Sequence, residues 1–261
     1  MEPKSEKAVV AAQYDSAGET WHRIRGSGHE LLEKPAIYGL LPNVEGKRVL
    51  CVGCRFGEEC ARISALGAAH VVGIDLSPGN IQQAKSNFPN LEFHEMDMEH
   101  IAFKPGSFDI IFSSLALHYV PSWNATLTGM RDALAPDGAI VISTHHPAAW
   151  SALKEEDNAK KRQILGFEVD KASGKVSFFG DYLHERPITA KFGGAFEASF
   201  YHKSFSGMLK EFRDAGLTVV DCTEPAPVAE AQTLDPQFWE IRSRFPLFIL
   251  FRLEPTRDAQ N

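Results

Sequence analysis

The sequence lacks several features that would place it in a specialised class of proteins. Its 261 residues include only four cysteines, which suits a reducing compartment better than a disulfide-stapled secreted domain. Acidic residues outnumber basic ones by 34 to 27, and no basic run is long enough to line a nucleic-acid groove. No stretch reaches the roughly 20 apolar residues of a membrane span, and the opening MEPKSEKAVV has no apolar core for a signal peptide. We therefore expect a cytoplasmic protein without a nucleic-acid or membrane partner.

Two of the cysteines, Cys51 and Cys54, form a C-x-x-C pair, a spacing that occurs in metal and redox sites. Cys51, however, belongs to an apolar run that predicts a buried strand, and no second C-x-x-C is present to complete a zinc site. We therefore predict no metal site. The composition, 44% hydrophobic and 23% charged, is that of a globular protein with one large α/β domain or such a domain with an appendage.

A glycine-containing turn between two predicted strands is the centre of the sequence. The residue pattern predicts a buried strand at Val49–Val52, a helix at Glu58–Leu66 and a second buried strand at His70–Ile74. Asp75 follows the second strand, at the edge where an open α/β sheet holds its ligand. An acid there can accept hydrogen bonds from ribose hydroxyls, so the segment predicts a nucleoside site.

The spacing of the glycines restricts the kind of nucleoside. Gly53 and Gly57 carry no Cβ, so the backbone can turn tightly and approach a ligand. A dinucleotide fingerprint requires further glycines where this sequence has Arg55 and Glu58. A carboxylate at that turn would repel a pyrophosphate, so NAD is disfavoured.

The segment resembles the class I S-adenosylmethionine (SAM) dependent methyltransferases of the small-molecule type (methyltransferase domain 11), whose first strand and turn typically read V-L-D-x-G-C-G-x-G. The similarity continues with L-A-L-H-Y-V at Leu115–Val120 and with L-x-P-x-G at Leu134–Gly138, and it covers about residues 47–144. It implies SAM as the cofactor. The implied fold is α/β and doubly wound, a Rossmann-like sheet of seven mostly parallel strands with one strand reversed.

The sequence departs from that family pattern at two positions. Cys51 stands where the family usually has an acid that helps to hold the methionyl amino group, and Arg55 replaces the middle glycine. These changes affect the part of the predicted pocket that would bind the methionyl group of SAM. We hypothesise that Arg55 contacts the methionyl carboxylate instead.

The resemblance also implies a set of cofactor contacts. Asp97, just past the third predicted strand, would accept a hydrogen bond from the adenine amino group, and Met98 would pack on the ring. Tyr14 lies in a segment that folds over the cofactor in similar proteins, although an ordinary amphipathic helix explains it equally well. The full set of predicted cofactor contacts is Tyr14, Gly53, Cys54, Arg55, Gly57, Asp75, Leu76, Asp97, Met98, Ser113 and Leu115.

Four residues are candidates for catalytic roles beside the methyl group: His118, His145, Tyr182 and His202. An imidazole titrates near neutrality and could act as a general base, if the acceptor starts protonated. His145 and His146 end the fifth predicted strand at the ligand edge, where they could equally form a polar loop held by backbone hydrogen bonds. Tyr182 comes from an aromatic-rich stretch, and ring faces attract the sulfonium cation.

The predicted organisation has four parts. Residues 1–46 form N-terminal cap helices, residues 47–147 the SAM-binding α/β core, residues 148–200 an insertion that covers the substrate, and residues 201–261 the rest of the core. Within these parts the sequence predicts a helix at His29–Leu41 broken by Pro35, a helix at His202–Phe212, and a last strand at Pro246–Leu253 on the sheet edge.

Three functions remain open from the sequence. The first is in-line methyl transfer from SAM to a small-molecule acceptor. The second is SAM consumption without methyl transfer, in which the amino group attacks the aminobutyryl carbon and releases methylthioadenosine. The third is a catalytically silent SAM-binding module, suggested by the missing acid at Cys51. The acceptor, the atom that is methylated and the oligomeric state cannot be read from the sequence.

Overall fold

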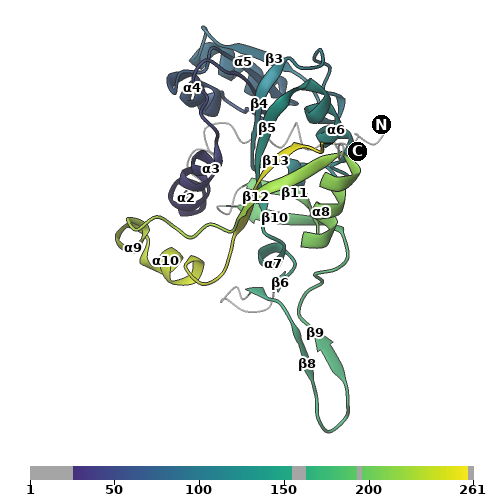
Figure 1. The fold of residues 1–261 in the computed structure, drawn as a ribbon. Coiled ribbons are helices and arrows are strands. Elements are labelled where there is room, and N and C mark those ends of the chain that lie inside the picture. Colours follow the sequence, from purple (N-terminus) through teal and green to yellow (C-terminus); the bar gives the residue numbers. More distant parts are fainter. Residues whose placement is uncertain (1–25, 155–162, 193–195, 258–261) are drawn as a thin grey trace, which may run out of the picture.

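The computed structural model describes residues 26–154, 163–192 and 196–257, and at its centre is a seven-stranded sheet (Figure 1). In sheet order the strands are β12 (Leu217–Thr223), β13 (Phe248–Pro255), β5 (Leu134–His145), β4 (Phe108–Ser114), β1 (Arg48–Val52), β2 (His70–Asp75) and β3 (Glu92–Glu95). Strands β5, β4, β1, β2 and β3 are parallel neighbours, and β13 is antiparallel to both β5 and β12. The predicted doubly wound α/β fold with one reversed strand is confirmed.

The predicted position of the last strand is wrong. It lies between β12 and β5 rather than at the edge. The burial pattern gives the reason, because Phe248, Ile249, Leu250 and Phe251 are all buried and so pack on both faces of the sheet. In β12 most residues are exposed, as expected of an edge strand.

Helices cover both faces of the sheet (Figure 1). Helices α3 (Lys34–Leu40), α4 (Glu58–Ala65) and α5 (Pro78–Asn87) bury Ile37, Ile63 and Ile81 in one core. Helices α6 (Asn124–Ala133) and α8 (Phe205–Asp214) bury Leu127 and Phe212 in the other. The C-terminal ends of the parallel strands therefore meet at one edge of a sheet that is covered on both sides.

The first described helical segment is continuous, so the predicted break at Pro35 is wrong. Helix α2 (Gly26–Gly28) runs into the π-helical turn η1 (His29–Glu33) and then into α3, whose first turn contains Pro35. Proline has no N–H to donate, and a wider π turn just before it accommodates the missing bond without ending the helix.

A third correction concerns His202. The strand β11 (Phe196–His202) ends at this residue, and α8 begins only at Phe205. The helix start is set by Ser204, whose hydroxyl accepts a hydrogen bond from the Gly207 N–H at 3.2 Å. The prediction was three residues too early because the polar residues before the cap also suit a strand end.

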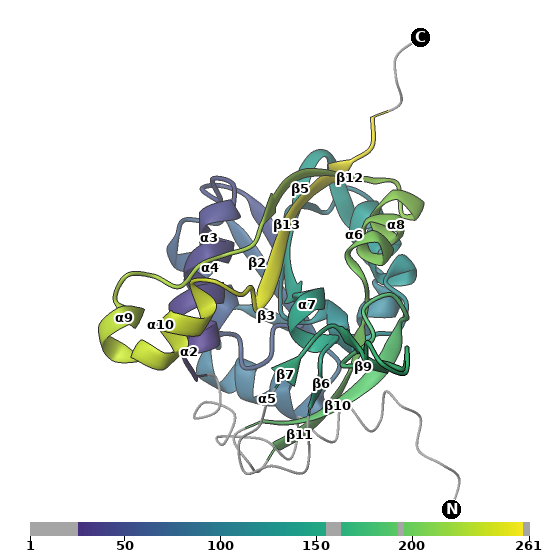
Figure 2. The same cartoon turned by 90° about the horizontal axis from the view of Figure 1, so that it is seen from below.

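The remaining elements lie at the end of the sheet where β5 finishes. Between β5 and β11 the chain forms α7 (Pro147–Trp150), β6 (Leu153–Lys154), β7 (Gln163–Ile164), β8 (Phe167–Val169), β9 (Val176–Phe178) and β10 (Arg186–Phe192). After β12 come α9 (Ala231–Leu234) and α10 (Pro236–Arg242), which lie beside α2 (Figure 2). The Ser27 hydroxyl donates to Asp235 and the Val228 N–H donates to the Leu31 carbonyl, and these bonds fasten the α9–α10 segment to the first helices.

Candidate functional site

The turn after β1 has an unusual backbone. Gly53, Arg55 and Gly57 all have positive φ, of 74°, 48° and 86°. The N–H groups of Gly53 and Cys54 both donate to the Ile74 carbonyl at 2.9 Å, which ties the turn to the end of β2. A Cβ on Gly53 would lie 2.6 Å from the Cβ of Ala116, so the segment after β4 closes directly on this turn. Glycine is required here by both φ and space.

The carboxylate of Asp75 is held against this turn by three donors. Its oxygens accept from the Arg55 N–H at 2.9 Å, and from the Ser77 N–H and the Asn80 side-chain amide at 3.0 Å each. Burial raises the pKa of Asp75, while these hydrogen bonds and the Arg55 charge oppose the shift. Because a carboxylate has about four acceptor positions, roughly one stays open to a ligand.

The side chains of Cys54 and Ser113 do not face that ligand edge. Cys54 is buried beside Cys60, and hydrogen bonding to that thiol, together with burial, raises the pKa of Cys54 well above its usual value. Such a thiol is unreactive. The wholly buried Ser113 hydroxyl donates to the Val52 carbonyl at 3.1 Å. Any contact that these two residues make with a ligand therefore comes from their backbone.

Leu115 follows β4 with a φ of 50°, a strained value for a leucine. Its N–H donates to the carbonyl and to the hydroxyl of Ser143, at 3.2 and 3.0 Å. The hydroxyls of Ser143 and Ser114 in turn donate to one carboxylate oxygen of Glu33, which is wholly buried. Glu33, in the N-terminal helical segment, therefore holds the strained Leu115 turn in place beside Gly53.

Glu33 is the principal site residue that the sequence analysis missed. Its other oxygen lies 2.9 Å from Nδ1 of His29, one helical turn earlier. A signal was present, since Glu33 falls on the same helical stripe as the apolar Ile37 and Leu40. A carboxylate within an apolar stripe indicates a buried polar network.

Asp97 and Met98 lie past β3, at the same sheet edge as Asp75. The Met96 N–H donates to the Asp75 carbonyl at 3.0 Å, which brings this segment to the end of β2. The Asp97 carboxylate accepts from the Glu99 N–H at 3.0 Å and so caps the short helix η2 (Met98–His100). Met98 is partly buried against the core. Leu76, also partly buried, follows Asp75 directly.

The structure brings His118 and His145 together. His118, in the short helix η3 (Leu117–Tyr119), stacks on His145 with ring centroids 3.8 Å apart. Trp150 stacks on His145 at 4.6 Å, and Phe200 meets the His145 ring edge-on at 4.5 Å. Burial lowers the pKa of His118 to about 3, and burial, with the neighbouring His118, lowers that of His145 well below its ordinary value. Both imidazoles are neutral at pH 7 and are weak bases.

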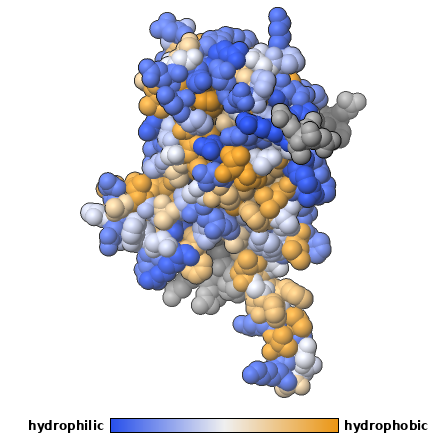
Figure 3. Space-filling model, viewed as in Figure 1, coloured by the Kyte–Doolittle hydropathy of each residue, from blue (hydrophilic) through white to orange (hydrophobic). Residues whose placement is uncertain are grey.

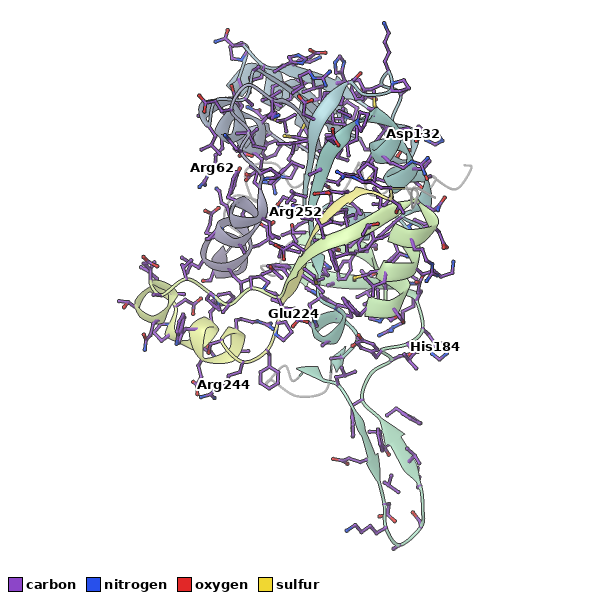
Figure 4. All side chains as sticks on the ribbon, viewed as in Figure 1. Arg62, Asp132, His184, Glu224, Arg244 and Arg252 are labelled. Carbon is purple, nitrogen blue, oxygen red and sulfur yellow. The ribbon has the colours of Figure 1, made fainter. Side chains whose placement is uncertain are left out.

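The other two catalytic candidates are paired with each other. Nε2 of His202 lies 2.8 Å from the Tyr182 carbonyl, and because a carbonyl only accepts, that nitrogen carries the proton. Burial lowers the pKa of His202. Nδ1 of His146 accepts from the Ala148 N–H, and its Nε2 lies 2.6 Å from the Glu224 carboxylate, so His146 joins the end of β5 to the segment after β12, where Figure 4 labels Glu224. Tyr14 lies outside the described residues.

The buried histidine stack predicts a dependence of stability on pH. Between an unfolded pKa near 6.5 and a native value of about 3, only the unfolded chain protonates His118, so stability is full above pH 6.5 and falls as the pH is lowered. Going from pH 7 to pH 5 should cost about 2 kcal/mol through His118 alone, measured by urea unfolding. His118→Gln should remove that part of the loss, and His184→Gln, at an exposed position (Figure 4), is the control. An equal loss in wild type and His118→Gln would contradict the assignment.

The sheet order, the glycine turn and the acid at its edge are those of the class I SAM-dependent methyltransferase fold, whose strand order reverses between β1 and β4, where the ligands of such sheets bind. Residues 50–142 match a family model described as a methyltransferase domain. In the part of the chain that the structure describes, no three His, Cys, Asp or Glu residues are grouped to hold a metal ion, and every helix is too short or too polar to span a bilayer.

Comparisons with individual proteins agree with this assignment. The chain is similar to the crystal structure of a SAM-dependent methyltransferase from Mesorhizobium loti, with a TM-score of 0.67 and 27% identity over 88% of this chain and 99% of that one. An uncharacterised protein of Haemophilus influenzae is 33% identical over 58% of this chain and 65% of its own length. A trans-aconitate 2-methyltransferase of Deinococcus radiodurans is 27% identical over 50% and 52%. The match thus spans about half to two thirds of these two curated relatives.

Proposed function

We propose that the protein binds SAM across the turn after β1 and transfers its methyl group in line to a small-molecule acceptor. The observation that carries this proposal is the hydrogen bond from the left-handed Arg55 backbone to Asp75, which joins the glycine turn and the edge acid into one surface. Such a surface suits SAM, whose ribose lies between the adenine and the methionyl part.

The placement of SAM follows from the acceptors at the sheet edge. The ribose lies at the open position of the Asp75 carboxylate, and the adenine lies beside Asp97 and Met98. The methionyl part extends from the turn toward Leu115, and Arg55 contacts its carboxylate. Of the predicted cover at residues 148–200, the part next to the end of β5 lies over the acceptor, which the stacking of Trp150 on His145 supports.

The neutral stack of His118 and His145 restricts the chemical class of the acceptor. Methyl transfer makes the sulfonium a neutral thioether, so the leaving group needs no acid, and a base is needed only if the nucleophile starts protonated. Because His118 and His145 are poor bases, we propose an acceptor whose nucleophile is unprotonated at neutral pH, such as a carboxylate. A relative named for trans-aconitate as its acceptor supports a small molecule of this kind.

Incubation with SAM and fractionated metabolite extracts tests the proposal. Mass spectrometry should detect S-adenosylhomocysteine (SAH) only when an acceptor fraction is present, and Asp75→Ala should abolish the product. Methylthioadenosine formed from SAM alone would instead support the SAM-cleaving reaction. Binding of SAM without any product across all fractions would support a catalytically silent module.

Replacing Arg55 should weaken SAH binding about tenfold or more, because a charged hydrogen bond contributes about 1.5–3 kcal/mol. Arg55→Gly relieves the positive φ as well as removing the guanidinium, so an equal loss in Arg55→Ala and Arg55→Gly assigns the effect to the side chain. Arg62→Ala is the control, since the guanidinium of this α4 residue lies over the ring of Tyr38 on α3. Calorimetry in which Arg55→Ala binds as tightly as wild type would exclude the contact.

A further inference from the structure

A two-stranded hairpin projects from the body of the protein (Figure 1). We call residues 165–180, with strands β8 and β9, the arm. Its register places Phe167 opposite Phe178 and Val169 opposite Val176. Side chains two residues apart in a strand share a face, so these four side chains form one apolar face. They are 66%, 69%, 50% and 43% exposed, respectively, and Figure 3 shows apolar residues along the arm together with hydrophilic ones.

The arm is an ordered hairpin rather than an irregular loop. At its tip the Asp170 N–H donates to the Lys175 carbonyl at 2.9 Å, and the Asp170 carboxylate accepts from the Ser173 N–H at 2.7 Å. Within the described chain, however, the β8–β9 pair has no third strand on either edge. An isolated hairpin is at best marginally stable in water, and exposed aromatic pairs add an apolar surface that a partner would bury.

Exposed apolar residues also lie on the segment with α9 and α10. Leu234, Ile241 and Phe245, which we call the α9–α10 patch, are 69%, 44% and 64% exposed. Ile241 and Phe245 are one helical turn apart, since the Phe245 N–H donates to the Ile241 carbonyl at 3.0 Å. The bond between Ser27 and Asp235 holds this segment to α2, so the patch is a fixed surface.

We propose that the arm of one copy packs on the α9–α10 patch of a second copy, and reciprocally, in a two-fold symmetric dimer. Such a pairing is closed, because each copy donates one arm and receives one. The arm is long enough for this contact, since six residues from Phe167 to its tip extend roughly 20 Å at about 3.3 Å each.

The buried area favours this arrangement over direct contact between two arms. Two apolar arm faces packed on each other would bury roughly 800 Å², below the ~1,200 Å² of a stable interface. Two reciprocal contacts between an arm and a patch would bury roughly 1,500 Å², within the usual range. This proposal does not depend on the proposed function.

Analytical ultracentrifugation of the full chain tests the dimer. Wild type should sediment as a dimer at micromolar concentration, and Phe167→Ser/Phe178→Ser in the arm and Ile241→Ser/Phe245→Ser in the patch should each weaken dimerisation at least 100-fold. Leu66→Ser, at an exposed leucine after α4, should leave the dimer unchanged. Circular dichroism should show that each variant is folded, since all the replaced side chains are exposed.

Mixing the two double variants gives the sharpest result. The intact patch of the arm variant can receive the intact arm of the patch variant through one contact, which buries only half of the wild-type interface. The mixture should therefore associate more weakly than wild type, whereas neither variant alone should associate at the same concentration. A wild type that stays monomeric at 100-fold higher concentration overturns the proposal. Dimerisation of the patch variant as strong as that of wild type would also overturn the proposal, and would indicate that the arms of two copies pair with each other.

Discussion

Asp75→Ala should weaken the binding of SAH at least 100-fold, as measured by isothermal titration calorimetry. The substitution removes the acceptor proposed for the ribose hydroxyl, a charge-assisted bond of about 1.5–3 kcal/mol. It also leaves the Arg55 and Ser77 N–H groups and the Asn80 amide without their acceptor, so the turn loses the contact that orders it. The two losses act on the same ligand surface and add to each other.

Asp109→Ala is the matched control for this experiment. Asp109 accepts two hydrogen bonds from the Arg48 guanidinium near the start of β4, at the opposite end of the strand from the ligand edge. Its removal should lower stability slightly and leave SAH affinity unchanged. Equal affinities of Asp75→Ala and wild type would show that the ribose lies elsewhere.

Gly53→Val should abolish SAH binding and lower the free energy of unfolding by about 3 kcal/mol, the combined scale of a strained φ and an overpacked contact. Valine is disfavoured at a φ of 74°, and its Cβ would lie 2.6 Å from that of Ala116. To relieve this contact the turn must move away from the Leu115 segment. Urea unfolding and calorimetry on the same sample measure both effects.

A double substitution separates the two causes. Gly53→Ala combined with Ala116→Gly removes the clash but keeps the backbone strain, so it should recover part of the stability lost in Gly53→Ala alone. Gly39→Ala, where a Cβ meets no atom within 4 Å, should retain full binding. Wild-type affinity in Gly53→Val would contradict the placement of the ligand on this turn.

The parts of the fold that the sequence predicted well depend on local chemistry. The first strand, the helix from Glu58 and the second strand follow from apolar periodicity, and Gly53 and Gly57 have the positive φ that their residue type permits. Ser77 caps α5 by the same kind of local chemistry, since its hydroxyl accepts from the Asn80 N–H and Pro78 follows at the first helical position. The roles of Asp75 and Asp97 in binding stay predictions.

The parts that could not be predicted depend on contacts between distant residues. Ser143 meets Glu33 across 110 residues of sequence, and no local pattern encodes that pair. The pKa of His118 is lowered by burial, and its stacking on His145 brings together rings from η3 and the end of β5. The position of β13 between β12 and β5 likewise arises from its burial on both faces of the sheet. A short apolar run in the sequence does not show whether a strand lies inside a sheet or at its edge.

A crystal structure of the protein with SAH at saturating concentration tests the central claim most directly. We expect the ligand across the glycine turn, with a ribose hydroxyl within ~3 Å of the Asp75 carboxylate and the purine beside Asp97. A turn that stays empty under these conditions, or SAH bound away from Asp75, would contradict it.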